Sequence, residues 1–92
     1  MSDDPLAALR LRFRERALSD ADGLASALQH SNEQDIEALA HGLAGAAGLF
    51  GFSEIGRQAK DIDGQFAAGD RPARSDVEAL IAAIRRDMAA YS

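Results

Sequence analysis

A single histidine stands in a run of small and apolar residues, Ala-His-Gly-Leu-Ala-Gly-Ala-Ala-Gly-Leu-Phe-Gly, between positions 40 and 51. Apolar residues recur around it with helical spacing, at positions 36, 39, 40, 43, 47 and 50, which predicts a helix with one buried face. His41 follows Leu39 by two residues, or about 200° around such a helix. Its imidazole is therefore expected to face solvent, where a large partner can reach it.

The expected neighbours of His41 on the solvent face are small. Glu37, Ala38, Ala44 and Gly45 lie one helical turn away, and Gly48 lies two turns on. We call these five positions the shelf and expect them to contact the partner. An exposed histidine that merely happens to lie on an alanine-rich helix is the alternative interpretation.

Three glycines inside this helix favour the interpretation that a partner binds here. Gly42, Gly45 and Gly48 each cost about 1 kcal/mol relative to alanine in a helix. Close approach of another molecule is the usual compensation. Close helix packing would account for Gly42, which lies nearer the apolar stripe, but accounts poorly for the other two.

The sequence His41-Gly42-Leu43-Ala44-Gly45, followed by Gly51, resembles the His-x-Leu-Lys-Gly...Gly signature of histidine-containing phosphotransfer (Hpt) domains. The resemblance implies a small helical bundle whose surface histidine carries a phosphoryl group between receiver domains of bacterial-type phosphorelays. The flanking amphipathic segments extend the resemblance over most of the chain. The chain departs from the signature at Ala44, where the family usually has lysine.

The same resemblance assigns supporting roles to two residues further along the chain. Hpt domains often hydrogen-bond the imidazole through an acidic or amide residue about two dozen positions after the histidine, and Asp63 lies 22 positions after His41. Asp63 would bind Nδ1–H and leave Nε2 as the nucleophile. Lys60, the only lysine, could replace the charge missing at Ala44. Alternatively, Lys60 pairs with Asp61 or Asp63, and Asp63 is simply a solvated carboxylate.

The resemblance implies a phosphoryl carrier rather than an autonomous kinase. His41 would accept a phosphoryl group from the aspartate of a receiver domain, in a response regulator or hybrid histidine kinase, and pass it to another receiver. The chain lacks an Asp/Asn cluster with the spacing of a tight Mg²⁺ site and a phosphate-binding glycine loop. We therefore expect no metal or cofactor on this chain, with Mg²⁺ on the receiver.

Two other function classes compete with this interpretation. A non-catalytic adaptor bundle would dock a partner over the shelf, with His41 as a bystander. A histidine-based hydrolase would need a nucleophile beside His41, and no serine lies within one turn of it.

Composition predicts one small helical domain over residues 1–92. The chain has 20 Ala and 10 Leu but one Val, five Ile and no Thr, a balance that favours helices. It has no cysteine and no apolar run long enough to span a membrane. A net charge of −5 argues against nucleic-acid binding. We expect a cytoplasmic monomer.

Helix start and stop signals divide the chain into four segments. Asp4-Pro5 opens the first, Ser31 the second, Ser53 the third and Ser75 the fourth. The expected core stripes are Leu6, Leu9, Phe13, Ala17, Leu24 and Leu28; Ile36, Leu39, Ala40, Leu43, Ala47 and Phe50; Ile55, Ala59, Ile62 and Phe66; and Val77, Leu80, Ile81, Ile84, Met88 and Tyr91. The short links predict an all-α, antiparallel up-down four-helix bundle.

The first segment carries side chains that its core stripe does not explain. Leu11 and Leu18 lie about 120° or more from the stripe, so either the helix is kinked or split between residues 19 and 23, or these leucines contact the partner. The arginines at positions 10, 12, 14 and 16 flank the stripe and are expected to lie along it as flexible stems rather than to bind an anion.

Overall fold

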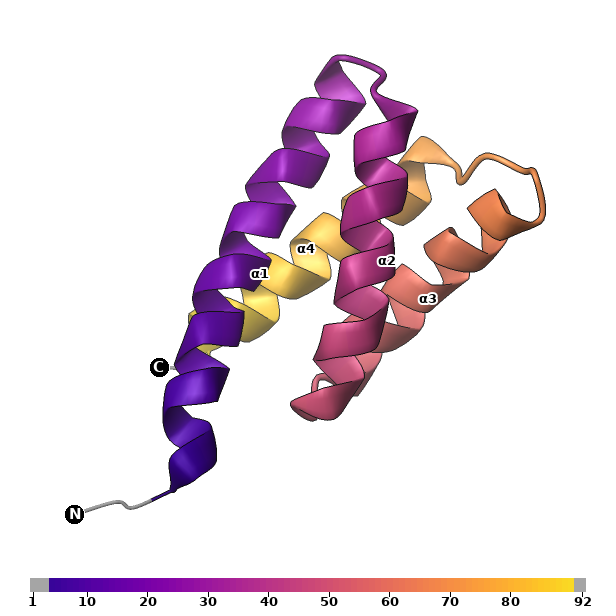
Figure 1. Ribbon diagram of the computed structural model, residues 1–92. Helices are drawn as coiled ribbons and strands as arrows, with labels where there is room; N and C mark the ends of the chain where they lie inside the picture. The colour runs from indigo at the N-terminus through magenta and orange to yellow at the C-terminus, as the bar shows by residue number, and fades with distance from the viewer. Residues whose placement is uncertain (1–3, 91–92) are drawn as a thin grey trace.

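The computed structural model describes residues 4–90, which form four helices and no strand (Figure 1). The helices are α1 (Pro5–Gln29), α2 (Glu33–Leu49), α3 (Ser53–Ala67) and α4 (Arg74–Ala90). The predicted all-α four-helix bundle is confirmed.

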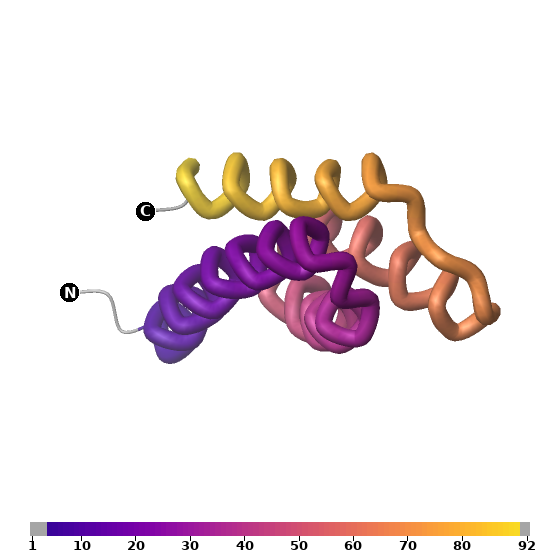
Figure 2. The backbone as a smooth tube through the Cα atoms, turned by 90° about the horizontal axis from the view of Figure 1, so that it is seen from above, coloured from indigo at the N-terminus to yellow at the C-terminus, as the bar shows by residue number. Residues whose placement is uncertain are grey.

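The chain runs up and down through the bundle, so that consecutive helices are antiparallel. Each helix packs on two others, in the pairs α1–α2, α2–α3, α3–α4 and α1–α4. Helix α4 passes behind the others in Figure 1 and lies along one side of them in Figure 2. One face of α2 is therefore left without a helical neighbour.

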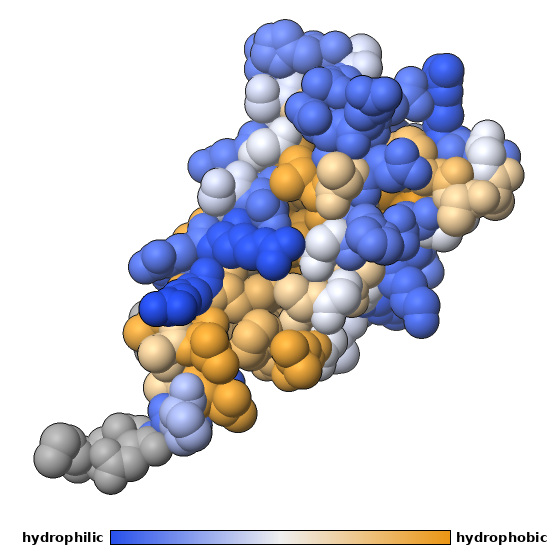
Figure 3. All heavy atoms as spheres, in the orientation of Figure 1, coloured by the Kyte–Doolittle hydropathy of each residue, from blue (hydrophilic) through white to orange (hydrophobic). Residues whose placement is uncertain are grey.

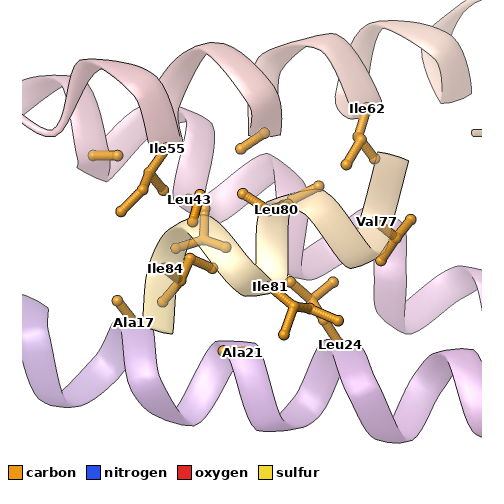
Figure 4. Packing of buried hydrophobic residues seen from close by; sticks show 14 of the residues in the cluster. Ala17, Ala21, Leu24, Leu43, Ile55, Ile62, Val77, Leu80, Ile81 and Ile84 are labelled. Carbon is orange, nitrogen blue, oxygen red and sulfur yellow. The ribbon is translucent and has the colours of Figure 1, made fainter. Parts of the chain in front are cut away.

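The core is built from one stripe of each helix (Figure 4). Fully buried side chains include Leu24 of α1, Leu43 of α2, Ile55 and Ile62 of α3, and Ile84 of α4. The described part of the chain buries no polar or charged residue, so apolar burial is the main force that holds the helices together. Tyr91, expected in this core, lies outside the described residues.

Helix α1 runs from Pro5 to Gln29 without a break, so the first segment is one helix and is not split between residues 19 and 23. Its 25 residues span about 37 Å, against about 25 Å for the 17 residues of α2. The N-terminal end of α1 consequently extends past the end of α2 (Figure 1). Leu6 and Leu9, expected in the core, are 46% and 44% exposed for this reason.

The helix starts agree with the sequence signals only in part. Asp4 caps α1 as predicted, because its side chain accepts a hydrogen bond from the Leu6 N–H at 2.9 Å. The cap of α2 is Asn32 rather than Ser31, which has a left-handed φ of 54°. Ser53 and Ser75 already lie inside α3 and α4. The three serine predictions were thus wrong by one or two residues.

Candidate functional site

His41 lies on the uncovered face of α2 with its side chain 78% exposed. The core residues Ala40 and Leu43, which flank it in sequence, are fully buried, because successive residues of a helix point about 100° apart. The outward orientation predicted from the periodicity is present.

Asp63 of α3 contacts the imidazole from one side. Its Oδ2 lies 3.2 Å from His41 Nδ1, within hydrogen-bond distance. Because a carboxylate only accepts hydrogen bonds, Nδ1 must carry the proton. Nε2 then bears the free lone pair and faces solvent, so the ring is held in the tautomer that suits a nucleophile.

Helices α2 and α3 approach each other closely one to two turns below this pair. A Cβ at the buried Gly56 would lie 3.4 Å from the backbone nitrogen of Gly48 and 3.6 Å from the Cβ of Ala47. This contact and the His41–Asp63 hydrogen bond fix the axial register of the two antiparallel helices. This register places Lys60 level with Ala44. Ala44 lies between His41 and Gly48 on α2, and Lys60 lies between Gly56 and Asp63 on α3.

Lys60 is exposed, and no ion pair to it is found among residues 4–90. The nearby Arg57, in contrast, donates to Glu54 at 2.6 Å and to Asp61 at 3.2 Å. The ammonium of Lys60 is therefore the cation of α3 available to the His41 side, opposite the position where the family usually has lysine.

The shelf lies open around His41. Glu37, Ala38, Gly45 and Gly48 are exposed, whereas Ala44 is half-buried and packs against the core. A Cβ placed at Gly45 or Gly48 would meet no atom within 4 Å. Intramolecular packing therefore does not require glycine at either position, which is consistent with space kept for a partner.

Leu11 and Leu18 are not part of this surface. Arg14 donates to the Met88 carbonyl of α4 at 2.9 Å, and Asp22 pairs with Arg85 of α4 at 3.0 Å. Leu18 lies one turn from both, so it belongs to the α4 side of α1, where it is half-buried against the core. Leu11 lies two turns earlier on the same side and is 52% exposed. Both leucines thus lie away from His41.

Gly42 contacts Arg16, one of the arginines whose side chains were expected to lie along the apolar stripe of the first helix. A Cβ at Gly42 would lie only 2.6 Å from Nη2 of Arg16 in α1. The guanidinium therefore occupies the space that a side chain at position 42 would fill. The one sequence signal for this contact was the glycine itself, for which helix packing was the expected reason.

The described residues 4–90 contain no cluster of three or more His, Asp or Glu side chains placed to hold a metal ion. None of the helices is long and apolar enough to cross a membrane, as far as the described residues extend.

The sequence profile of the Hpt domain matches residues 8–91 of the 92-residue chain. The chain belongs to the Hpt domain family. Hpt domains act in histidine phosphotransfer in two-component systems and interact with receiver domains. No curated protein and no solved structure matches this Hpt domain, so the geometry described above is the basis for assigning roles to individual residues.

Replacement of Asp63 is expected to slow phosphoryl transfer without unfolding this Hpt domain. Asp63→Ala removes the acceptor that fixes the tautomer, and we expect a loss of about 10- to 100-fold in rate, the size of effect seen when the orienting partner of a metal-binding histidine is removed. Asp63→Asn keeps an acceptor oxygen and should lose less. The exposed pair contributes at most about 1 kcal/mol to folding, so the thermal midpoint should hardly change.

Asp61→Asn is the matched control, since Asp61 lies two residues away on α3 and pairs with Arg57 instead. Initial rates of transfer from a phosphorylated receiver measure the effect. Equal rates for Asp63→Ala and Asp61→Asn would show that the hydrogen bond to His41 has no part in transfer.

Proposed function

We propose that this Hpt domain is a phosphoryl carrier of a bacterial-type phosphorelay, with His41 as the acceptor. The single observation that carries the proposal is the exposed imidazole whose Nδ1 is hydrogen-bonded to Asp63 at 3.2 Å. This arrangement presents Nε2 to a partner, while the small side chains of the shelf leave room for the partner's active site.

In the proposed step, the Nε2 lone pair attacks the phosphorus of an aspartyl phosphate on a receiver domain. The P–N bond forms as the P–O bond to the receiver aspartate breaks, and the aspartate leaves as a carboxylate. The Nδ1 proton stays on the ring, which becomes a phosphorylated imidazolium. The negative charge of Asp63 beside Nδ1 stabilises that cation, so the same contact that selects the tautomer also stabilises the product.

The receiver domain supplies the metal ion, which this chain is not expected to bind. We propose that Mg²⁺, held by the receiver, neutralises the charge of the transferring phosphoryl group. The chain acts as a monomer in the cytoplasm and alternates between receivers of response regulators or hybrid histidine kinases. In the second step, a carboxylate oxygen of another receiver aspartate attacks the phosphorus, a P–O bond forms as the P–N bond breaks, and His41 leaves as the neutral imidazole.

The direct test is phosphotransfer profiling against the receiver domains of the source organism. Incubation with each phosphorylated receiver should yield acid-labile phosphate on this chain for a small subset of them. Binding to receivers without any transfer would support the adaptor alternative and contradict the proposal.

The cationic role of Lys60 is part of the proposal. Lys60→Gln is expected to slow transfer about fivefold, because a charge-assisted hydrogen bond at an exposed site contributes about 1 kcal/mol. Arg57→Gln is the control, since Arg57 is already bound by Glu54 and Asp61. Adding Ala44→Lys to Lys60→Gln should restore part of the rate, because position 44 lies one turn from His41. Wild-type kinetics of Lys60→Gln would contradict the cationic role of Lys60.

A further inference from the structure

The guanidinium of Arg16 lies against Gly42, and we call this contact the seat of Arg16. It brings a second cation, besides Lys60, to the neighbourhood of His41. Consecutive Cα atoms are about 3.8 Å apart, and Arg16 Nη2 lies 2.6 Å from the Cβ position of the residue that follows His41. Arg16 reaches this place from α1, on the opposite side of His41 from Asp63 and Lys60. The imidazole thus stands between a carboxylate and an ammonium on α3 and a guanidinium on α1.

The guanidinium is held there loosely. Its Nε lies 3.6 Å from Oδ2 of Asp20, too far for a hydrogen bond, and that oxygen has no other partner. Burial raises the pKa of the Asp20 carboxyl, and the charge of Arg16 opposes this effect. No acceptor for the Nη groups of Arg16 is found within residues 4–90. The planar end of the side chain therefore keeps donors available for an anion.

The surface of α2 between this guanidinium and the imidazole carries only small residues. The intervening positions on the outer surface of α2 are Ala38 and Gly45, both exposed, and a Cβ at Gly45 would meet no atom within 4 Å. The Arg16 side chain is itself 53% exposed, so it can turn across this gap without displacing packed atoms. A group attached to Nε2 of His41 would lie above the same surface.

We infer that Arg16, seated on Gly42, binds the phosphoryl group of phosphorylated His41. The inference rests on the proposed function of His41 and adds a residue of α1 to its site. A guanidinium presents two parallel N–H donors that match the oxygens of a phosphoryl group. Gly42 serves this purpose because any larger residue would occupy the seat of the guanidinium.

Arg12 provides the internal control. It lies one turn before Arg16 on α1, is exposed, and shares with it a groove formed by Leu9, Phe13, Ala46 and Phe50. If the arginines of α1 act only by attracting an acidic partner, Arg12 and Arg16 should be equivalent. If Arg16 binds the phosphoryl group, the two should differ in the isolated phosphoprotein, where no partner is present.

The test loads the full chain chemically with phosphoramidate, so it does not depend on any receiver. The proteins are wild type, Arg16→Gln, Arg16→Lys and Arg12→Gln, with His41→Gln to subtract phosphate on His30. Phosphorus NMR follows the decay of the phosphohistidine and the pKa of its phosphoryl group. The P–N bond breaks through a loose transition state, in which the phosphoryl oxygens carry less negative charge than in the phosphohistidine itself. A cation bound to these oxygens therefore stabilises the phosphohistidine more than the transition state and should slow its hydrolysis.

Arg16→Gln is expected to shorten the half-life about fivefold, by loss of charge-assisted hydrogen bonds at an exposed site, and to raise the pKa of the phosphoryl group. Arg16→Lys should recover part of both effects, and Arg12→Gln should leave both as in wild type. Equal half-lives and equal titrations for Arg16→Gln and Arg12→Gln would overturn the inference. A normal Arg16 effect without transfer from any receiver would contradict the proposed relay function alone.

Gly42→Ala tests the seat separately. Alanine favours the helix, so the thermal midpoint should stay the same or rise, while the new Cβ displaces the guanidinium and shortens the half-life toward that of Arg16→Gln. The double variant should decay no faster than Arg16→Gln, because both changes remove the same cation. A wild-type half-life for Gly42→Ala, or additive losses in the double variant, would refute the seat.

Discussion

His41→Gln is expected to abolish phosphoryl acceptance while the bundle stays folded. The side chain is 78% exposed and contributes one hydrogen bond, to Asp63, so its removal should change the free energy of unfolding by less than about 1 kcal/mol. The glutamine amide offers no nucleophile of comparable strength, so transfer should fall below detection.

The measurement is incorporation of labelled phosphate from a receiver that phosphorylates the wild-type chain, with circular dichroism as the check of folding. His30→Gln is the control, because His30 is also exposed but is bound through Nδ1 to the Ser26 carbonyl at the end of α1. His30→Gln should accept phosphate as wild type does. Retained labelling of His41→Gln would reject His41 as the acceptor.

Gly45→Leu is expected to produce the second largest effect, a loss of transfer with a gain in helix stability. Leucine is the better helix former by up to about 1 kcal/mol, and a Cβ at position 45 meets no atom within 4 Å. The bundle should therefore melt at the same or a higher temperature. The added side chain would fill the space above the shelf that a receiver must enter. A loss of about 1.4 kcal/mol in binding free energy already weakens the affinity for the receiver tenfold.

Two measurements separate steric exclusion from damage to the site. The rate of transfer from the receiver should fall about tenfold or more, whereas loading of His41 by phosphoramidate should remain within about twofold of wild type, since the small donor needs little space. Gly64→Leu is the control, because Gly64 is also an open, exposed helical position, on α3. A wild-type transfer rate for Gly45→Leu would mean that the receiver does not approach over this part of α2.

The apolar surface at the free end of α1 is a separate feature of the molecule. Hydrophobic residues gather at the lower end of the molecule in Figure 3, where Leu6, Leu9 and Leu49 are all exposed. Leu6 and Leu9 are exposed because α1 is longer than the helices it packs on, whereas Leu49 is the last residue of α2. The same periodicity buries Phe13 and Ala17, which lie within the bundle.

The sequence alone determined the features that depend on one helix at a time. The spacing of apolar residues sets the angle of each side chain about its own helix axis, so the outward position of His41 and the buried stripes of α2 and α4 could be predicted. Resemblance to the family signature added Asp63, whose distance in sequence from His41 is characteristic of these domains. Local capping chemistry was enough to predict that Asp4 caps α1, but it did not give the caps of the later helices. At α2, for example, Ser31 and Asn32 are adjacent and both can cap a helix, and Asn32 is the cap.

Only the tertiary structure decided how the helices lie along one another. Periodicity does not fix axial register; the close contact of Gly56 with Gly48 does, and this register brings Asp63 to His41 and Lys60 level with Ala44. Likewise, the arginines of α1 are equivalent by local pattern, and only the packing of α1 on α2 seats Arg16 on Gly42 while it turns Leu18 toward α4. Side chains from separate helices meet through packing between helices, which depends on contacts far apart in the chain.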